Sequence, residues 1–190
     1  MGRTAAPLAS VALDEQPLGL PESEEVVVGP STFLEGEHGV ISKRSFGQET
    51  VLFTIRGRVS ARRTKYTFQC GPSEHIDPVD PEGNPGFGQY TNHSCTPNAY
   101  VKLVARNGET SIEVVTLTHI EIGDEVTIDY SAMEFEIANP VRCACGARTC
   151  RGRIVGFREL DEAVKRRHER TGMIPGYLLD LDRSQAEPAG

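Results

Sequence analysis

Short apolar runs rich in β-branched residues recur along the middle of the chain, each bounded by glycine, proline or serine. Such runs are typical of strands, and the Asn107-Gly108 pair between two of them is the signal of a tight hairpin turn. The runs cover residues 26–28, 51–55, 66–70, 100–104, 111–117 and 125–130. The pattern predicts a mostly-β architecture of short strands.

Three segments depart from this pattern. Residues 1–25 show neither a strand nor a helix period, and we expect a poorly ordered tail there. Residues 71–88 contain four prolines and four glycines, which predicts a long irregular loop of the kind that often has a function. Residues 160–168 predict a helix, with acidic residues early and basic residues late, as the helix dipole favours. Its basic residues 165–167 are better explained as a solvated helix end than as a nuclear signal.

Composition limits the location and the partners. The 190 residues suffice for one domain with a core, and their formal net charge of −7 favours a basic peptide over nucleic acid as a partner. No signal peptide and no apolar run long enough to span a membrane is visible. With an odd number of cysteines, five, we expect a reduced intracellular location, cytoplasmic or nuclear, and not a secreted protein.

The cysteines gather in one short run. Cys143, Cys145 and Cys150 lie within eight residues of one another. A tetrahedral zinc site needs four ligands, with Zn–S distances of about 2.3 Å. The run supplies three thiolates, and a fourth from elsewhere in the chain, such as Cys95, would complete the site. Zinc bound in this way would attach the C-terminal segment to the body of the domain.

Four strings of sequence resemble one known family. Residues 92–98 (Asn-His-Ser-Cys-Thr-Pro-Asn) and 122–130 are similar to the two signature motifs of SET-domain protein lysine methyltransferases. Residues 143–152 resemble the zinc-binding post-SET segment of that family, and residues 36–40 its glycine-rich cofactor motif. The resemblance covers roughly residues 26–155. It implies small curved sheets and a C-terminal strand threaded under a loop, a pseudoknot.

The resemblance also implies a division of the chain and an activity. We expect a tail over residues 1–25, a SET domain over 26–140, a zinc-binding post-SET segment over 141–156 and a C-terminal helical extension over 157–190. The implied reaction is methyl transfer from S-adenosylmethionine to a lysine side chain of a protein or peptide, such as a histone tail. This reaction needs a neutral amine held in line with the methyl group, so positioning matters more than a nucleophile of the enzyme.

The resemblance assigns roles to individual residues. Tyr130 matches the catalytic tyrosine, whose phenol orients the amine while its ring walls the channel. Tyr90 and Ile128 are expected to line the substrate channel, and Cys70 remains a buried thiol. The expected zinc ligands are Cys95, Cys143, Cys145 and Cys150. The expected cofactor-binding residues are His38, Gly39, Val40, Tyr66, Asn92, His93 and Ile154.

The chain departs from the family pattern at several positions. The glycine motif before Val40 is slightly out of register, Gln89 stands where an arginine is common, and Ile55 stands where a second active-site tyrosine is common. Ile55 and Ile128 carry no hydroxyl, so we expect a channel that accepts a second or third methyl group. Two alternatives stay open: methylation of a small-molecule amine, and a SET-like module that binds partners without turnover. The intact Tyr130 counts against the latter.

Overall fold

The computed structural model describes residues 20–80, 82–137 and 140–186, and most of the expected N-terminal tail lies outside these ranges. One sheet brings together strands that are far apart in sequence. Its order is β1 (Val26–Pro30), β2 (His38–Ser42), β10 (Glu125–Ile128) and β7 (Asn92–His93). β10 pairs antiparallel with β2 and parallel with β7, so that Thr127 faces Asn92 and Ile128 faces His93. This register places the two signature motifs side by side.

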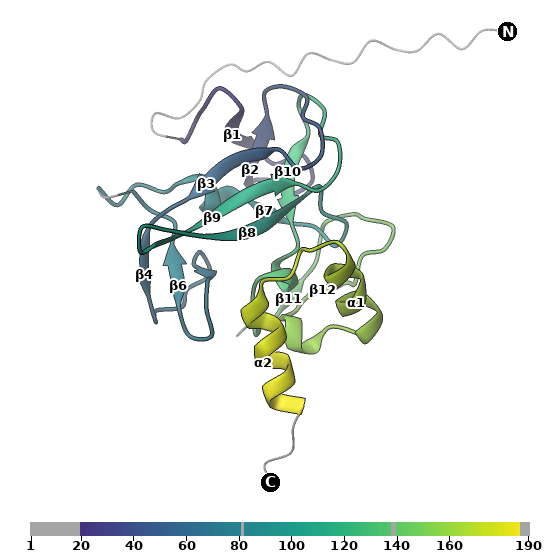
Figure 1. Cartoon of the computed structure of the whole chain (residues 1–190). Coiled ribbons are helices and arrows are strands. Elements are labelled where there is room, and N and C mark those ends of the chain that lie inside the picture. The colour runs from purple at the N-terminus through teal and green to yellow at the C-terminus, as the bar shows by residue number, and fades with distance from the viewer. Residues whose placement is uncertain (1–19, 81, 138–139, 187–190) are drawn as a thin grey trace, which may run out of the picture.

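A second sheet has the order β3 (Val51–Ile55), β9 (Glu109–Thr116) and β8 (Ala99–Arg106), and it lies across the front of the molecule in Figure 1. The hairpin between β8 and β9 turns at Asn107 and Gly108, which have φ angles of 53° and 81°. Positive φ at both central residues is what this tight turn requires. The predicted hairpin is therefore confirmed.

Two smaller sheets complete the β structure: β4 (Arg58–Ser60), β6 (His75–Asp77) and β5 (Phe68–Gln69) in one, β11 (Val141–Arg142) and β12 (Arg153–Ile154) in the other. The expectation that residues 71–88 form an irregular loop is wrong in part, because β6 lies within them and the 3₁₀ turn η1 (Phe87–Tyr90) begins at their end. β6 is stabilised by β4 on one side and β5 on the other. The pairing with β4 joins residues that are distant in sequence, such as Arg58 and Asp77, and leaves no local signal in a proline-rich segment.

The mostly-β class with small sheets is confirmed, although two strands are shorter than predicted. The run at 66–70 forms a strand only at Phe68–Gln69. β10 ends at Ile128, because Asp129 accepts a hydrogen bond from the amide of Ser131 and begins the 3₁₀ turn η2 (Tyr130–Ala132). The threaded connection stays a prediction.

The C-terminal segment contains two helices where one was predicted. After the 3₁₀ turn η3 (Phe157–Glu159) come α1 (Glu162–Arg170) and α2 (Gly176–Ala186), which lie below the sheets in Figure 1. Lys165 is buried, which corrects the expectation of a solvated helix end. Its ammonium lies 2.8 Å from the carboxylate of Asp182 and 5.1 Å from the ring centroid of Phe157. The next two basic residues are exposed, as expected.

Two apolar clusters form the interior. The larger one lies among the sheets and includes Val126 and Ile128 of β10. The smaller one contains Phe135, Phe157, Leu160 and Leu178. Because Phe135 precedes the cysteine run and Leu178 belongs to α2, the helical pair packs directly onto the body of the domain. Within the described ranges, no helix is long and apolar enough to cross a membrane.

Candidate active site and metal centre

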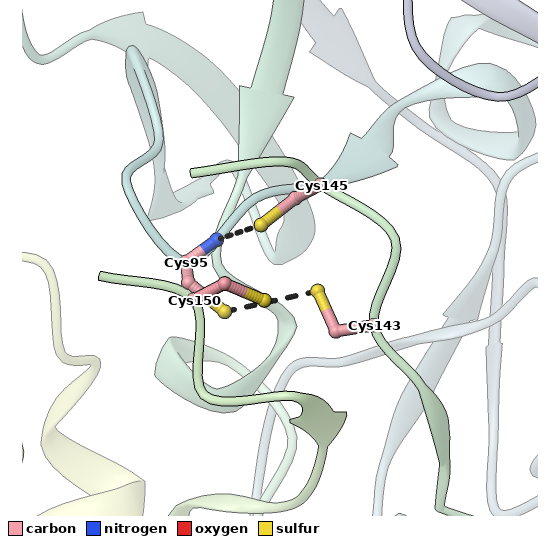
Figure 2. Close-up of side chains that lie close together, drawn as sticks. All are labelled: Cys95, Cys143, Cys145 and Cys150. Atoms are coloured by element: carbon pink, nitrogen blue, oxygen red, sulfur yellow. Dashed lines mark hydrogen bonds between the residues drawn. The ribbon is translucent and has the colours of Figure 1, made fainter. Parts of the chain in front are cut away.

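Four cysteines from two distant parts of the chain converge on one point. The sulfur atoms of Cys95, Cys143, Cys145 and Cys150 all lie within 4.8 Å of one another. Figure 2 shows them facing one another, with Cys95 Sγ and Cys143 Sγ 3.8 Å apart. A tetrahedron with Zn–S distances of about 2.3 Å has S–S edges of about 3.8 Å, so the donor set fits zinc. The four predicted ligands are thus brought together, and Cys70 is not among them.

Backbone amides point at these sulfur atoms. The Cys95 amide nitrogen lies 3.5 Å from Cys145 Sγ, and the Arg151 amide nitrogen lies 3.4 Å from Cys95 Sγ. Burial opposes ionisation of Cys145, but the hydrogen bonds from Cys95 and Ala147 outweigh it and lower the pKa of this thiol to about 6. Amides that donate to sulfur favour the thiolate, which is the form that binds a metal.

A buried carboxylate connects the cysteine cluster to the 3₁₀ turn η2. Asp129 receives two hydrogen bonds of 2.7 Å from the guanidinium of Arg151, which follows the last cysteine. His168 Nε2 of α1 lies 3.1 Å from Oδ2 of this carboxylate. Burial opposes ionisation of Asp129, but the bonds from His168 and Arg151 hold its pKa well below the ordinary value. Asp129 therefore remains charged and fixes three segments at one point.

His93 lies between the cysteine cluster and Tyr130. Its Nδ1 accepts a hydrogen bond from the Tyr130 amide at 3.2 Å, and its Nε2 lies 3.4 Å from Cys95 Sγ. Burial lowers the pKa of His93 to about 4, although the charge of Asp129 opposes this. The ring is therefore neutral, and because Nδ1 accepts, Nε2 carries the proton and donates to the sulfur. This contact orients His93 against the metal centre.

Tyr130 lines a cavity of about 400 Å³. Its hydroxyl donates to the carbonyl oxygen of Thr91 at 2.8 Å, and burial raises the pKa of the phenol, which stays neutral. Because its proton is engaged, the oxygen can accept a hydrogen bond from an amine. The other lining residues are Arg63, Thr64, Lys65, Tyr66, Thr67, Phe68, Gly88, Gln89, Met133, Glu134, Ile137, Val141 and Ile154.

A second polar cluster surrounds the carboxylate of Glu125 in β10. It accepts hydrogen bonds from the Thr32 amide at 2.6 Å and from Asn92 Nδ2 at 2.7 Å, and Asn92 also donates to the carbonyl of His38 at 2.8 Å. A Cβ atom on Gly39 would lie 2.2 Å from this carboxylate. A side chain at this position would therefore displace the Glu125 carboxylate, and glycine permits this close approach. The cluster holds the start of β2, at His38 and Gly39, and Asn92 together.

The predicted cofactor residues fall into two neighbouring groups. Tyr66 and Ile154 line the cavity with Tyr130, whereas His38, Gly39 and Asn92 surround Glu125. His93 lies beside the Tyr130 ring, at 5.3 Å between centroids. Val40, the other predicted residue, is buried in the core.

The two predicted channel residues do not line the cavity. Ile128 belongs to the main core and is 1% exposed. Tyr90 makes an edge contact with the ring of His38, at 6.3 Å between centroids. Gln89, the neutral residue where an arginine is common, lines the cavity itself, and so do Arg63 and Lys65.

Sequence reasoning missed two buried acids, Glu125 and Glu134. Glu134 lines the cavity, accepts a hydrogen bond from the Gln69 amide at 2.8 Å, and lies 3.8 Å from Arg63 and 3.9 Å from His75. Burial raises its pKa to about 7. The available signal for Glu134 was its place between two apolar residues, Met133 and Phe135. A buried acid needs specific partners.

Comparisons with known proteins agree with this geometry. A family model described as SET domain matches residues 24–131. Histone-lysine N-methyltransferase set-2 of Caenorhabditis elegans is 36% identical over 110 residues, which cover 52% of this chain and 7% of that protein. The H3 lysine-36 specific histone-lysine N-methyltransferase of Yarrowia lipolytica is 26% identical over 164 residues, 86% of this chain and 20% of that protein. Histone-lysine N-methyltransferase Set2 of Drosophila melanogaster is 31% identical over 139 residues, 73% of this chain and 6% of that protein.

This chain therefore spans a fifth or less of the length of these relatives. Among solved structures, that of KRYPTONITE in complex with mCHH DNA, H3(1-15) peptide and SAH is similar with a TM-score of 0.55 and 24% identity. The similarity covers 67% of this chain and 29% of that one. At 24% identity, this similarity supports a shared fold and carries no conclusion about activity.

Proposed function

The chain belongs to the SET domain family, and from this membership we propose that it methylates a lysine side chain of a protein or peptide with S-adenosylmethionine as donor. The observation that carries the proposal is the place of Tyr130, whose neutral phenol is held by Thr91 at the wall of the cavity. The relatives named histone-lysine N-methyltransferases support the same reaction class.

Tyr130 performs the chemistry by orientation. When bound, S-adenosylmethionine supplies a methyl group activated by a sulfonium. The Tyr130 oxygen, with its own proton given to the Thr91 carbonyl, accepts a hydrogen bond from the neutral acceptor amine. This contact directs the nitrogen lone pair away from the phenol, and an amine held in one direction reacts with a lower entropic cost.

The residues present fit the donor. Asn92 donates through its side-chain nitrogen to His38 and Glu125 and keeps a carbonyl oxygen for the ammonium of an amino acid. Tyr66 and Ile154 offer apolar walls for a flat base. Gln89 cannot pair with a carboxylate as an arginine would, but Arg63 and Lys65 line the same cavity and can supply the positive charge.

Zinc bound by the four cysteines would be structural. All four positions of the tetrahedron are taken by thiolates, so no position remains for a substrate or a water. We propose that this centre fixes residues 141–156, including Ile154, against the domain over residues 26–140. The helical extension over residues 157–190 completes the proposed division of the chain.

The acceptor we propose is a lysine within a basic peptide. The chain carries a formal net charge of −7, which attracts a cationic segment. Two observations on relatives point the same way: they are named for histone lysines, and KRYPTONITE was solved with a histone H3 peptide. A histone tail or another basic tail is thus the first acceptor to test.

The decisive experiment uses S-adenosylmethionine labelled at the methyl group. Wild-type protein and Tyr130→Phe are incubated with histones, basic peptides and a fractionated lysate, and binding of the cofactor is measured by calorimetry. We expect label on lysine with the wild type, a loss of about 100-fold or more with Tyr130→Phe, and similar cofactor affinity. Label in the small-molecule fraction alone would indicate a small amine as acceptor. Cofactor binding with no transfer would indicate a binding module.

A further inference from the structure

Two segments of the cavity wall are joined by side chains. The backbone amide of Gln69 donates to Glu134 Oε1 at 2.8 Å, and the backbone amide of Phe135 donates to the side-chain oxygen Oε1 of Gln69 at 2.8 Å. Their neighbours Phe68, Met133 and Glu134 line the cavity. The spacing of these two segments therefore sets the width of the cavity on this side.

A tyrosine from the C-terminal helix α2 lies at the same junction. The hydroxyl of Tyr177 is 2.8 Å from the carbonyl oxygen of Gln69 and 2.5 Å from that of Met133. Its single proton is shared between the two carbonyls, so the hydroxyl joins both segments at once. Leu178, the next residue, is fully buried in the smaller apolar cluster, which fixes the position of α2.

A second contact comes from helix α1. His168 is 1% exposed, and its Nε2 lies 3.1 Å from the carboxylate of Asp129, the residue before Tyr130. The two helices thus reach the catalytic wall at two separate points, one beside Tyr130 and one at Met133. Both contacts come from residues beyond the cysteine run, in the predicted C-terminal helical extension, for which the sequence indicated no role in the site.

We infer that Tyr177 is a positioning residue for the proposed methyl transfer: its hydroxyl holds the segments at Gln69 and Met133 at the spacing that the reaction requires. The inference rests on the proposed function for its catalytic consequence, but not for its structural one. Without the hydroxyl, the Gln69 and Met133 carbonyls lose a shared donor and the two segments separate. A displacement of about 1 Å at such a wall can cost about 100-fold in rate.

The test compares Tyr177→Phe with Tyr100→Phe. Both remove one hydroxyl and keep the ring, but the Tyr100 hydroxyl donates to Glu49 at 2.9 Å in an exposed contact away from the cavity. Amide hydrogen exchange is measured at Gln69 and Phe135, together with kcat and KM for S-adenosylmethionine and a histone peptide. A role in overall stability alone would change exchange throughout the sheets and would not select these two amides.

We expect Tyr177→Phe to accelerate exchange at Gln69 and Phe135 about tenfold or more and to lower kcat by about 10- to 100-fold, with KM changed less than about threefold. Tyr100→Phe should change neither. Wild-type exchange and kcat in Tyr177→Phe would overturn the inference. If the wild type transfers no methyl group, the proposed function fails. The exchange data still decide whether the Tyr177 hydroxyl holds the segments at Gln69 and Met133 together. If Tyr177→Phe does not fold, the wild type alone decides. Backbone amides of Gln69 and Phe135 that exchange without protection in the wild type would then overturn the inference.

Discussion

Asp129 and Arg151 form a bidentate ion pair in which both nitrogen–oxygen distances are 2.7 Å. One partner immediately precedes Tyr130 and the other immediately follows Cys150. The Asp129 side chain is completely buried, and that of Arg151 is 16% exposed. The pair thus joins the segment of Tyr130, the proposed catalytic tyrosine, to the segment of the cysteine cluster, and a change at either end affects both.

Arg151→Gln should destabilise the protein strongly. Removal of the guanidinium leaves the Asp129 carboxylate buried beside the His168 and His93 rings, at 3.1 and 3.6 Å, without the cation that pairs with it. Breaking a buried pair in this way typically costs about 3 to 5 kcal/mol of unfolding free energy, which urea titration measures.

The matched control is Arg158→Gln. Arg158 also pairs with a carboxylate, that of Glu136 at 2.6 Å, but the two side chains are 55% and 50% exposed. Pairs of this kind contribute about 0 to 1 kcal/mol. Equal losses of unfolding free energy in the two variants would show that burial adds nothing to the stability contributed by the Asp129–Arg151 pair.

Zinc removal should release the C-terminal segment. We expect about one zinc per chain, lost in Cys145→Ser and on treatment with a strong chelator, with faster proteolysis after residue 141. Cys70→Ser is the control, because Cys70 does not belong to the cluster of four sulfur atoms. Elemental analysis decides: a zinc content that falls in Cys70→Ser and not in Cys145→Ser would refute the assigned ligands.

Features with a local signal were predictable from the sequence. The β8–β9 hairpin follows from Asn107-Gly108, which can adopt positive φ at little cost. The convergence of Cys95 on the cysteine run followed from the resemblance to a family, since the chemistry of zinc demands a fourth ligand but does not say which one. The sulfur atoms do converge.

Features that depend on long-range contacts were not predictable. β6 forms because β4 and β5 flank it, and α2 is fixed by Leu178 in a cluster with Phe135. Ile128 was assigned to the substrate channel, but its side chain lies in the core. Which face of a short strand points inward depends on the neighbouring layers. The expectation of a second or third methyl transfer, which used Ile128, stays a prediction.

Gly39→Ala should weaken cofactor binding without unfolding the protein. The new Cβ would lie 2.2 Å from Glu125 Oε1, which forces the carboxylate away from Asn92. A lost buried hydrogen bond costs about 1 to 3 kcal/mol, equivalent to about a 5- to 150-fold rise in Kd for S-adenosylmethionine. Calorimetry measures this Kd directly.

Gly47→Ala provides the control for this substitution. No atom lies within 4 Å of a Cβ built at Gly47, so the added methyl group meets open space. This variant should bind the cofactor as the wild type does. If Gly39→Ala also keeps wild-type affinity, the cluster around Glu125 has no part in the cofactor site.

Glu134 should make the protein less stable as the pH rises toward neutrality. Burial raises the pKa of this carboxyl from an ordinary value of 4.5 to about 7 in the folded state. Between these values the folded state holds the proton more tightly than the unfolded state. The stabilisation is complete below pH 4.5 and is lost as the pH rises through 7. At about 1.36 kcal/mol for each unit of pKa, the loss is roughly 3 kcal/mol.

The neighbouring groups do not reproduce this dependence. Burial raises the pKa of Cys70 to about 11, outside the window. Burial also lowers the pKa of His75, so that histidine destabilises the protein as the pH falls, which is the opposite sign. Glu134→Gln keeps an oxygen for the Gln69 amide and cannot titrate, so subtracting its profile from that of the wild type isolates the carboxyl.

Urea unfolding between about pH 5 and pH 8 tests the prediction. Relative to wild type, Glu134→Gln should gain stability steadily as the pH rises. The control is Glu136→Gln, whose carboxylate is 50% exposed and pairs with Arg158, so its difference from wild type should stay nearly constant. A constant difference for Glu134→Gln as well would mean that Glu134 is ionised across this range in the folded protein. The cavity would then present a fixed negative charge beside Arg63, favouring a cationic group on the bound substrate at every pH tested.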